Sequence, residues 1–222
     1  MTWKNYFTTS VGRKIQMGLT GLFLIIFLVV HCYINALVFW NDGGEKFEAA
    51  AHFMGTNVII RTVEIGLFAF LLLHIIQGLA LWIRNRSRRS TSYAVHRRNE
   101  TSAWYRRSMG ILGSLILIFL IVHVGTFWAP NRYSQTIGQG ELDLYQMMAE
   151  TFQSPFMVIF YIGGCFALAW HLVHGFYSAF QTLGMNNNRY KGIINGVGIG
   201  FSIIIPLIFA LMPLAFYFQW ID

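Results

Sequence analysis

The sequence predicts an all-α integral membrane protein with five transmembrane helices, and three observations support this class. The chain of 222 residues is 55% hydrophobic and only 11% charged, which is less than half of the roughly 25% typical of soluble domains. Its apolar residues lie in five long runs, and its cations gather in the segments between alternate runs. Residues 1–222 are therefore expected to form a single transmembrane domain.

The five apolar runs give the predicted spans in chain order, at 15–40, 58–83, 108–129, 155–183 and 193–219. Each run exceeds the roughly 20 residues that cross the hydrocarbon core of a bilayer. The first run is too long and begins too late for a cleaved signal peptide, and no small-residue cleavage site follows it. We therefore expect all five runs to remain in the membrane.

The charges predict the orientation of these spans. Thirteen of the 16 lysines and arginines lie before span one, between spans two and three, or directly after span four. The positive-inside rule then puts the N-terminus in the cytoplasm and the C-terminus outside. This distribution argues against a nucleic-acid partner, despite a net charge of +7. The arginine-rich loop 85–107 is either a topology signal alone or also a contact for anionic lipid or a docked cytoplasmic partner.

Two outer segments connect the spans on the other side, and both are too short for a separate domain. Residues 41–57 are expected to form a loop, and so are residues 130–154, which begin with the helix breaker Pro130. Within the second loop, residues 143–152 predict a short interfacial helix.

An internal repeat relates spans one and two to spans three and four. Spans one and three each contain two glycines three residues apart, followed ten residues later by a histidine. Spans two and four each contain a histidine followed four residues later by a glycine. The matching residues are Gly18, Gly21 and His31 with Gly110, Gly113 and His123, and His74 and Gly78 with His171 and Gly175. Such a duplication predicts a four-helix bundle to which span five is added.

The four repeated histidines pair by depth in the membrane. His31 and His123 lie 18 and 17 residues beyond cytoplasmic arginines, which puts both roughly 26 Å from the cytoplasmic anchors. His74 and His171 lie well along spans that run inward, so this second pair is nearer the cytoplasm. Depth alone therefore predicts an outer pair, His31 with His123, and an inner pair, His74 with His171.

A histidine inside a bilayer is energetically costly unless it has a polar partner or binds a metal. Two facing pairs of histidines are what two bis-histidine haems b require. The alternative is that these histidines only form hydrogen bonds between helices. Zinc or copper sites would usually add carboxylate or thiolate ligands, and no acid lies near mid-membrane. The sequence therefore predicts a membrane electron carrier with two haems.

Glycines near the predicted ligands would leave room for the macrocycles. Gly78 and Gly175 each follow a ligand by one helical turn on the same face. Gly21 and Gly113 lie about 15 Å inward of the outer pair, near the depth of the inner haem. His174 is a rival ligand in span four, but Ser178 occupies the position one turn after it. His174 is therefore expected to contact a propionate instead.

Further candidates lie near the two membrane surfaces. Glu64, near the outer end of span two, is either a proton acceptor beside a quinone or an ion-pair partner of Arg61. His52, in the adjoining loop, is a weaker candidate at the same site. Arg106 and Arg107, at the inner mouth of span three, either bind haem propionates or anchor the helix at the interface.

These residues give the chain a resemblance to a known family. The matching stretches begin at Thr20-Gly-Leu-Phe before His31, Ala50-Ala-His52-Phe-Met, Arg61-Thr-Val-Glu64 before His74, Met147-Met-Ala with Ser154-Pro155, and His171 with Gly175-Phe-Tyr-Ser-Ala-Phe. Together with the histidine placement, they resemble the di-haem, five-helix cytochrome b membrane-anchor subunit of succinate dehydrogenase and fumarate reductase. The resemblance covers nearly the whole chain.

The resemblance implies partners that this sequence does not contain. These are a flavoprotein and an iron–sulfur protein on the cytoplasmic face, and a quinone, which we expect to be menaquinone, near the outer haem. It also gives His31 and His123 to the outer haem and His74 and His171 to the inner haem. One departure concerns Ala169, because some members carry at this position a glutamate implicated in transmembrane proton movement.

We therefore expect a membrane anchor that completes a succinate:quinone oxidoreductase in a bacterial cytoplasmic (inner) membrane and is not catalytic alone. The first alternative is a di-haem anchor of another quinone-coupled enzyme, such as a hydrogenase or formate dehydrogenase. The second is a haem-free transporter or scaffold.

Overall fold

The computed structural model describes residues 9–87, 108–185 and 187–221, and every regular element among them is helical. This confirms the predicted all-α class. The helices in chain order are α2 (Ser10–Ala36), η1 (Leu37–Trp40), α3 (Glu45–Thr56), α4 (Val58–Ser87), α6 (Met109–His123), η2 (Val124–Trp128), α7 (Ala129–Thr136), α8 (Leu144–Thr151), α9 (Pro155–Thr182) and α10 (Asn188–Tyr217).

Five helical stretches of the described chain are long and apolar enough to cross a membrane. They are Val11–Trp40, Val58–Arg84, Met109–Thr136, Pro155–Thr182 and Arg189–Tyr217. All five predicted spans are thus present, and their side chains are buried only sparsely. Sparse burial is expected where lipid takes the place of water as the solvent for apolar side chains.

The third span extends beyond its predicted end at residue 129. Its helix continues through the π-turn η2 into α7, and Pro130 is the second residue of α7. The prediction that Pro130 ends the span was wrong. A π-turn accommodates a missing N–H because it already shifts the hydrogen-bond register, as in the bond from Ala129 N to the Val124 carbonyl.

The outer segment 41–57 is mostly helical, which also differs from the predicted loop. Gly43 and Gly44 have φ angles of 66° and 86°. Glycine adopts these positive angles without steric cost, so the chain can turn here. Helix α3 follows directly, with Glu45 and Glu48 in its first turn, where carboxylates favour the positive end of the helix dipole. Asn57 then caps α4, because its side-chain oxygen accepts a hydrogen bond from the Ile59 N–H at 3.0 Å.

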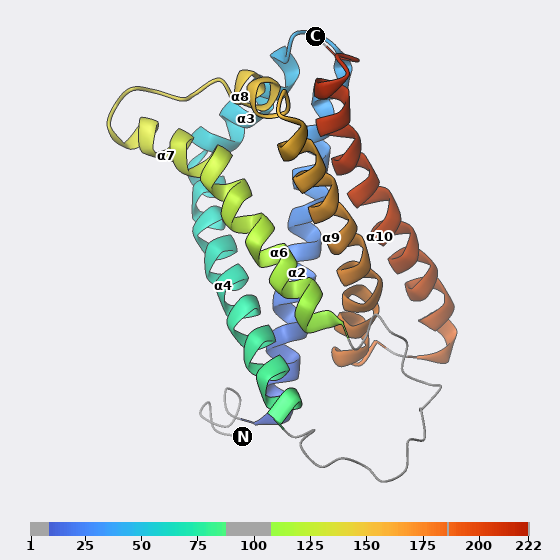
Figure 1. Ribbon diagram of the computed structural model, residues 1–222. Helices are drawn as coiled ribbons and strands as arrows, with labels where there is room; N and C mark the ends of the chain where they lie inside the picture. Colours follow the sequence, from blue (N-terminus) through green and yellow to red (C-terminus); the bar gives the residue numbers. More distant parts are fainter. Residues whose placement is uncertain (1–8, 88–107, 186, 222) are drawn as a thin grey trace.

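The predicted interfacial helix at 143–152 is present as α8. The Asp143 side chain caps it by accepting a bond from the Gln146 N–H at 2.8 Å. Helices α3, α7 and α8 lie at the end of the molecule where α10 ends, opposite the start of α2 (Figure 1). This end holds the largest cluster of buried apolar side chains, around Phe47, Met148 and Phe216.

Contacts between the long helices form a closed ring. Helix α2 contacts α4, α4 contacts α6, α6 contacts α9, and α9 returns to α2, while α10 packs outside the ring against α9 and α2. Figure 1 shows the same arrangement, with α10 at one edge beside α9. This agrees with the expected four-helix bundle and added fifth helix. It also makes α2 and α6 one diagonal pair, and α4 and α9 the other.

Candidate functional site

The structure brings the four predicted histidines together in two pairs across the diagonals of the ring. The ring centres of His31 on α2 and His123 on α6 lie 5.8 Å apart. Those of His74 on α4 and His171 on α9 lie 6.3 Å apart. The pairs are the ones that depth predicts. Because diagonal helices face each other across the bundle, each pair spans the interior of the ring.

These separations fit two ligands of one metal. With a metal–nitrogen bond of about 2 Å and a ring radius of about 1.1 Å, two imidazoles on opposite sides of an ion have centres about 6.2 Å apart. The described part of the chain has no cluster of three or more His, Cys, Asp or Glu side chains that suits a bare metal ion. A haem iron needs only two protein ligands, since the macrocycle supplies the others, so the donor set fits haem.

The Nδ1 atoms of the histidines differ in their polar contacts. His74 Nδ1 lies 3.1 Å from the Thr20 hydroxyl, and His123 Nδ1 lies 3.5 Å from the Tyr161 hydroxyl. His31 Nδ1 lies 3.3 Å from the side-chain nitrogen of Asn35. His171 Nδ1 is buried without a hydrogen-bond partner. The hydroxyl oxygens beside His74 and His123 can accept from Nδ1–H and so orient a metal-bound imidazole through the nitrogen that does not bind the metal, whereas the Asn35 side-chain nitrogen can only donate.

Two of the predicted glycines lie beside the inner pair. A Cβ atom at Gly21 would lie 3.6 Å from His74 Cε1, and one at Gly175 would lie 3.9 Å from His171 Cδ2. Gly113 has open space around it. Gly78 instead faces the methyl group of Met17 at 3.2 Å, so its role is the close packing of α4 on α2.

The outer pair is surrounded by aromatic rings. Phe27 stacks on His31 with ring centres 5.1 Å apart, and Phe119 stacks on His123 at 5.5 Å. Phe209 of α10 lies 5.5 Å from His31. These rings give the outer pair aromatic neighbours on α2, α6 and α10.

A cleft of about 450 Å³ opens between α4 and the outer part of the third span. Its polar residues include Glu64, and its apolar walls include Val58 and Ile65, whose exposed fractions of 80% and 74% place the cleft on the lipid side of α4. The π-turn connects it to the outer pair, because Phe127 lies 5.7 Å from the His123 ring and the next residue, Trp128, lines the cleft.

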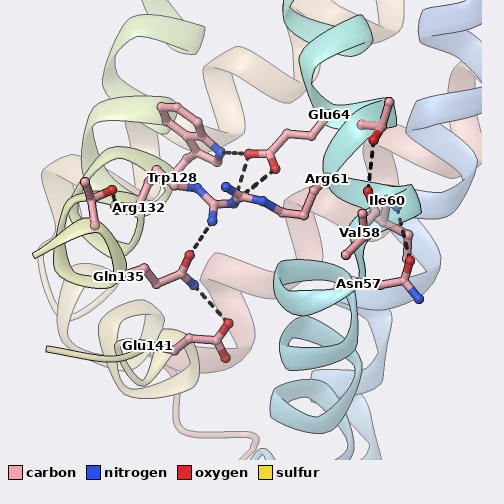
Figure 2. Close-up of polar contacts among 11 residues, drawn as sticks. Asn57, Val58, Ile60, Arg61, Glu64, Trp128, Arg132, Gln135 and Glu141 are labelled. Atoms are coloured by element: carbon pink, nitrogen blue, oxygen red, sulfur yellow. Dashed lines mark hydrogen bonds and ion pairs between the residues drawn. The ribbon is translucent and has the colours of Figure 1, made fainter. Parts of the chain in front are cut away.

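Glu64 is the centre of a polar cluster in this cleft (Figure 2). Arg132 Nη2 lies 3.0 Å from both carboxylate oxygens, and Trp128 Nε1 donates to Oε1 at 2.5 Å. Arg61 Nη1 forms the ion pair expected from the sequence, at 3.3 Å. Glu64 thus has two guanidinium partners rather than one.

The cluster extends toward the outer surface. Arg132 donates to the side-chain oxygen of Gln135, and Gln135 Nε2 donates to Glu141 at 2.9 Å. Glu141 lies 2.6 Å from Nδ1 of the exposed His52. An amide and a guanidinium do not pass protons readily, so this chain of contacts holds Arg132 in place and links α3, α7 and the segment before α8.

Sequence reasoning missed Trp128, Arg132, Gln135 and Glu141. The first two are four residues apart, which is one turn of a continuous helix. The expectation that Pro130 ends the span hid this signal.

The remaining predicted residues are His174, Arg106 and Arg107. His174 is partly buried on α9, three residues after His171. Arg106 and Arg107 lie outside the described residues.

Glu48 on α3 joins this helix to α8 at the outer end of the bundle. Its side chain accepts a hydrogen bond from the Tyr145 N–H of α8 at 2.6 Å. Burial raises the pKa of Glu48, and nearby Asp143 and Glu141 raise this pKa further, while the backbone N–H bonds partly offset the rise.

A comparison with known proteins shows the family of the chain. The chain is 30% identical over 161 residues to the succinate dehydrogenase cytochrome b558 subunit of Bacillus subtilis (strain 168). The aligned region covers 72% of this chain and 73% of that protein. The chain belongs to the succinate dehydrogenase cytochrome b family. Family membership and five apolar helices identify it as a multi-pass membrane protein. No protein-family model matches the chain, and no solved structure matches it.

Proposed function

We propose that this chain is the di-haem membrane anchor of a succinate:quinone oxidoreductase. It would carry electrons between an iron–sulfur subunit, docked with a flavoprotein on the cytoplasmic face, and a quinone near the outer face. The observation that carries the proposal is the pair of diagonal histidine sites with ring centres 5.8 and 6.3 Å apart. Two b haems bound there would supply one-electron steps through the membrane.

The residues of the chain have distinct roles in this proposal. His31 and His123 hold the outer haem, and His74 and His171 hold the inner haem. The inner site receives electrons first from a cytoplasmic partner, and the outer site passes them to the quinone. His174, Arg106 and Arg107 remain proposed contacts for the propionates, where cations can form charge-assisted bonds.

The outer cleft is the proposed quinone site. Its apolar walls and lipid-side opening suit a quinone that diffuses within the bilayer, and its polar end suits the quinone oxygens. Quinone reduction takes up two protons, and quinol oxidation releases them. Trp128 and Arg132 orient the Glu64 carboxylate, which exchanges these protons. His52 acts only through Glu141, at the outer entrance.

The proposed orientation rests on the charge distribution. The cation-rich segments adjoin the start of α2, the end of α4 and the start of α10, which lie at one end of the bundle. We place this end in the cytoplasm and the end bearing α3, α7 and α8 outside. The proposed membrane is the bacterial cytoplasmic membrane.

A reduced-minus-oxidised spectrum of the purified complex tests the proposal, together with haem stoichiometry and electron paramagnetic resonance. We expect a b-type spectrum, two haems per chain, two low-spin ferric signals and a co-purified flavoprotein. A colourless preparation would favour a transporter or scaffold instead. A di-haem preparation that contains a hydrogenase or formate dehydrogenase would favour the other quinone-coupled anchors.

A further inference from the structure

Thr20 makes two polar contacts with one hydroxyl group. The residue is 3% exposed, and its Oγ1 lies 2.8 Å from the carbonyl oxygen of Gln16. A carbonyl can only accept, so the single hydroxyl proton of Thr20 points to the backbone, with Met17 O as a weaker second acceptor at 3.3 Å. A lone pair of the hydroxyl therefore remains for His74 Nδ1 at 3.1 Å.

This geometry determines the tautomer of His74. Because the Thr20 oxygen is the acceptor, the proton of the neutral imidazole must lie on Nδ1, and Nε2 then carries the free lone pair. A neutral imidazole with a free Nε2 is the form that binds iron. The hydroxyl thus selects a ligand form that an unpartnered histidine would adopt only part of the time.

The contact is built into the packing of α2 on α4. Gln77 Nε2 donates to the side-chain oxygen of the buried Gln16 at 3.0 Å, which ties the two helices together one turn before Thr20. The next residue, Gly21, allows the α2 backbone to approach the imidazole, since a Cβ there would lie 3.6 Å from Cε1. The Gln16–Gln77 hydrogen bond and the close approach at Gly21 therefore hold Thr20 against His74.

The other three histidines have weaker restraint at Nδ1. The contacts of His31 and His123 are longer, at 3.3 and 3.5 Å, and His171 Nδ1 has no partner. Within the inner pair, only one of the two rings is held by a hydrogen bond to a side chain.

We propose that Thr20 is a positioning residue that fixes the tautomer of His74 and thereby lowers the midpoint potential of the inner haem. An acceptor at Nδ1–H increases the basicity of the ring, and a more basic ligand stabilises ferric iron over ferrous iron. Loss of the hydroxyl therefore raises the potential. This inference rests on the proposed function, because it assumes a haem between His74 and His171.

The test compares three variants of the complete complex in membranes. Thr20→Val keeps the shape and removes the hydroxyl, and Thr20→Ser keeps the hydroxyl and removes the methyl group. Thr182→Val is the matched control, because the Thr182 hydroxyl also donates to a helix carbonyl, Ser178 O at 2.7 Å, and forms no hydrogen bond with a histidine ring in the described part of the chain. Each variant is examined by redox titration and by electron paramagnetic resonance of the ferric haems.

We expect Thr20→Val to increase the ferrous-to-ferric ratio of the inner haem at a fixed potential by about threefold to tenfold, which is about 30 to 60 mV for one electron. Its low-spin signal should also shift, since the ring is no longer held. The outer haem should keep its potential. Thr20→Ser and Thr182→Val should both match the unmodified complex.

Two results would overturn the inference. One is an unchanged inner potential in Thr20→Val, and the other is an equal shift in Thr20→Ser, which would trace the effect to packing of the methyl group. If Thr20→Val does not accumulate, Thr20→Ala removes the same hydroxyl from a smaller side chain and is judged by the same criteria. Failure of the proposed function is a separate result, because the unmodified complex would then lack two low-spin haem signals.

Discussion

The inner and outer histidine pairs have nearly the same separation but are held by different means. At the inner pair, a hydroxyl bond holds one imidazole and two glycines lie beside the rings. At the outer pair, phenylalanines stack on both imidazoles, and the polar contacts are longer. Stacking restrains the plane of a ring without selecting its tautomer. The comparison teaches that two repeats of one helix pair can reach the same ligand geometry through polar restraint or through packing.

The largest expected effect concerns the independence of the two pairs. Replacing His31 or His123 by leucine should remove the outer low-spin haem, and replacing His74 or His171 should remove the inner one. Each loss follows because a haem with one axial ligand is high-spin or unbound. Redox titration of the four variants measures this. The comparison fails if replacement of His31 and replacement of His74 abolish the same haem component in the redox titration.

The second prediction concerns the cleft that adjoins only the outer pair. Glu64→Gln should lower quinone turnover by about 100-fold, the usual scale for loss of a proton-transfer group. Both haems and the activity of the partner with a soluble dye should remain. Glu150→Gln is the matched control, since Glu150 also lies at the outer end but does not line the cleft. Normal quinone turnover in Glu64→Gln would remove Glu64 from the site.

The third prediction sharpens the contrast between polar restraint and packing. Tyr161→Phe removes the 3.5 Å contact with His123 but keeps the aromatic ring. The ferrous-to-ferric ratio of the outer haem should change by less than about twofold, because so long a contact adds little to ligand basicity. The control is Tyr133→Phe on the exposed side of α7. A larger shift than that of Thr20→Val would reverse the comparison.

A smaller effect is expected at the outer end, where Glu48 joins α3 to α8. Its folded-state pKa is raised, so the folded protein binds this proton more tightly than the unfolded chain does. Its contribution to stability is therefore greatest below the ordinary glutamate pKa and is lost as pH rises through the raised value. Glu48→Gln should remove this pH dependence from the hydrogen exchange of α3 and α8. An unaltered pH profile would contradict the prediction.

The smallest expected effect is that of His174→Leu. The inner haem should remain low-spin, because the His74 ring centre already lies 6.3 Å from that of His171. Paramagnetic resonance of this variant should still show two low-spin signals. Loss of one signal, together with its retention in His171→Leu, would exchange the roles of the two histidines.

Much of the site follows from local patterns in the chain. The depths of His31, His74, His123 and His171 follow from counting residues at a constant helical rise, and the structure brings together the pairs so predicted. The Arg61–Glu64 ion pair also follows from spacing within one helix. The helix α3 and the continuation past Pro130 were not predicted, because glycine and proline signal a break without stating which backbone geometry accommodates them.

The sequence by itself determined the membrane class, the five spans, the likeness to its family and the depth of each histidine, since hydropathy and helical rise are properties of a single chain segment. Only the tertiary structure decided that the pairs cross the diagonals, that Arg132 reaches Glu64 and that Thr20 meets His74. Arg132 and Glu64 lie 68 residues apart in the chain and Thr20 and His74 lie 54 apart, while the members of each histidine pair are farther apart still. Their meeting depends on how each helix is rotated and tilted, and packing against neighbouring helices sets both.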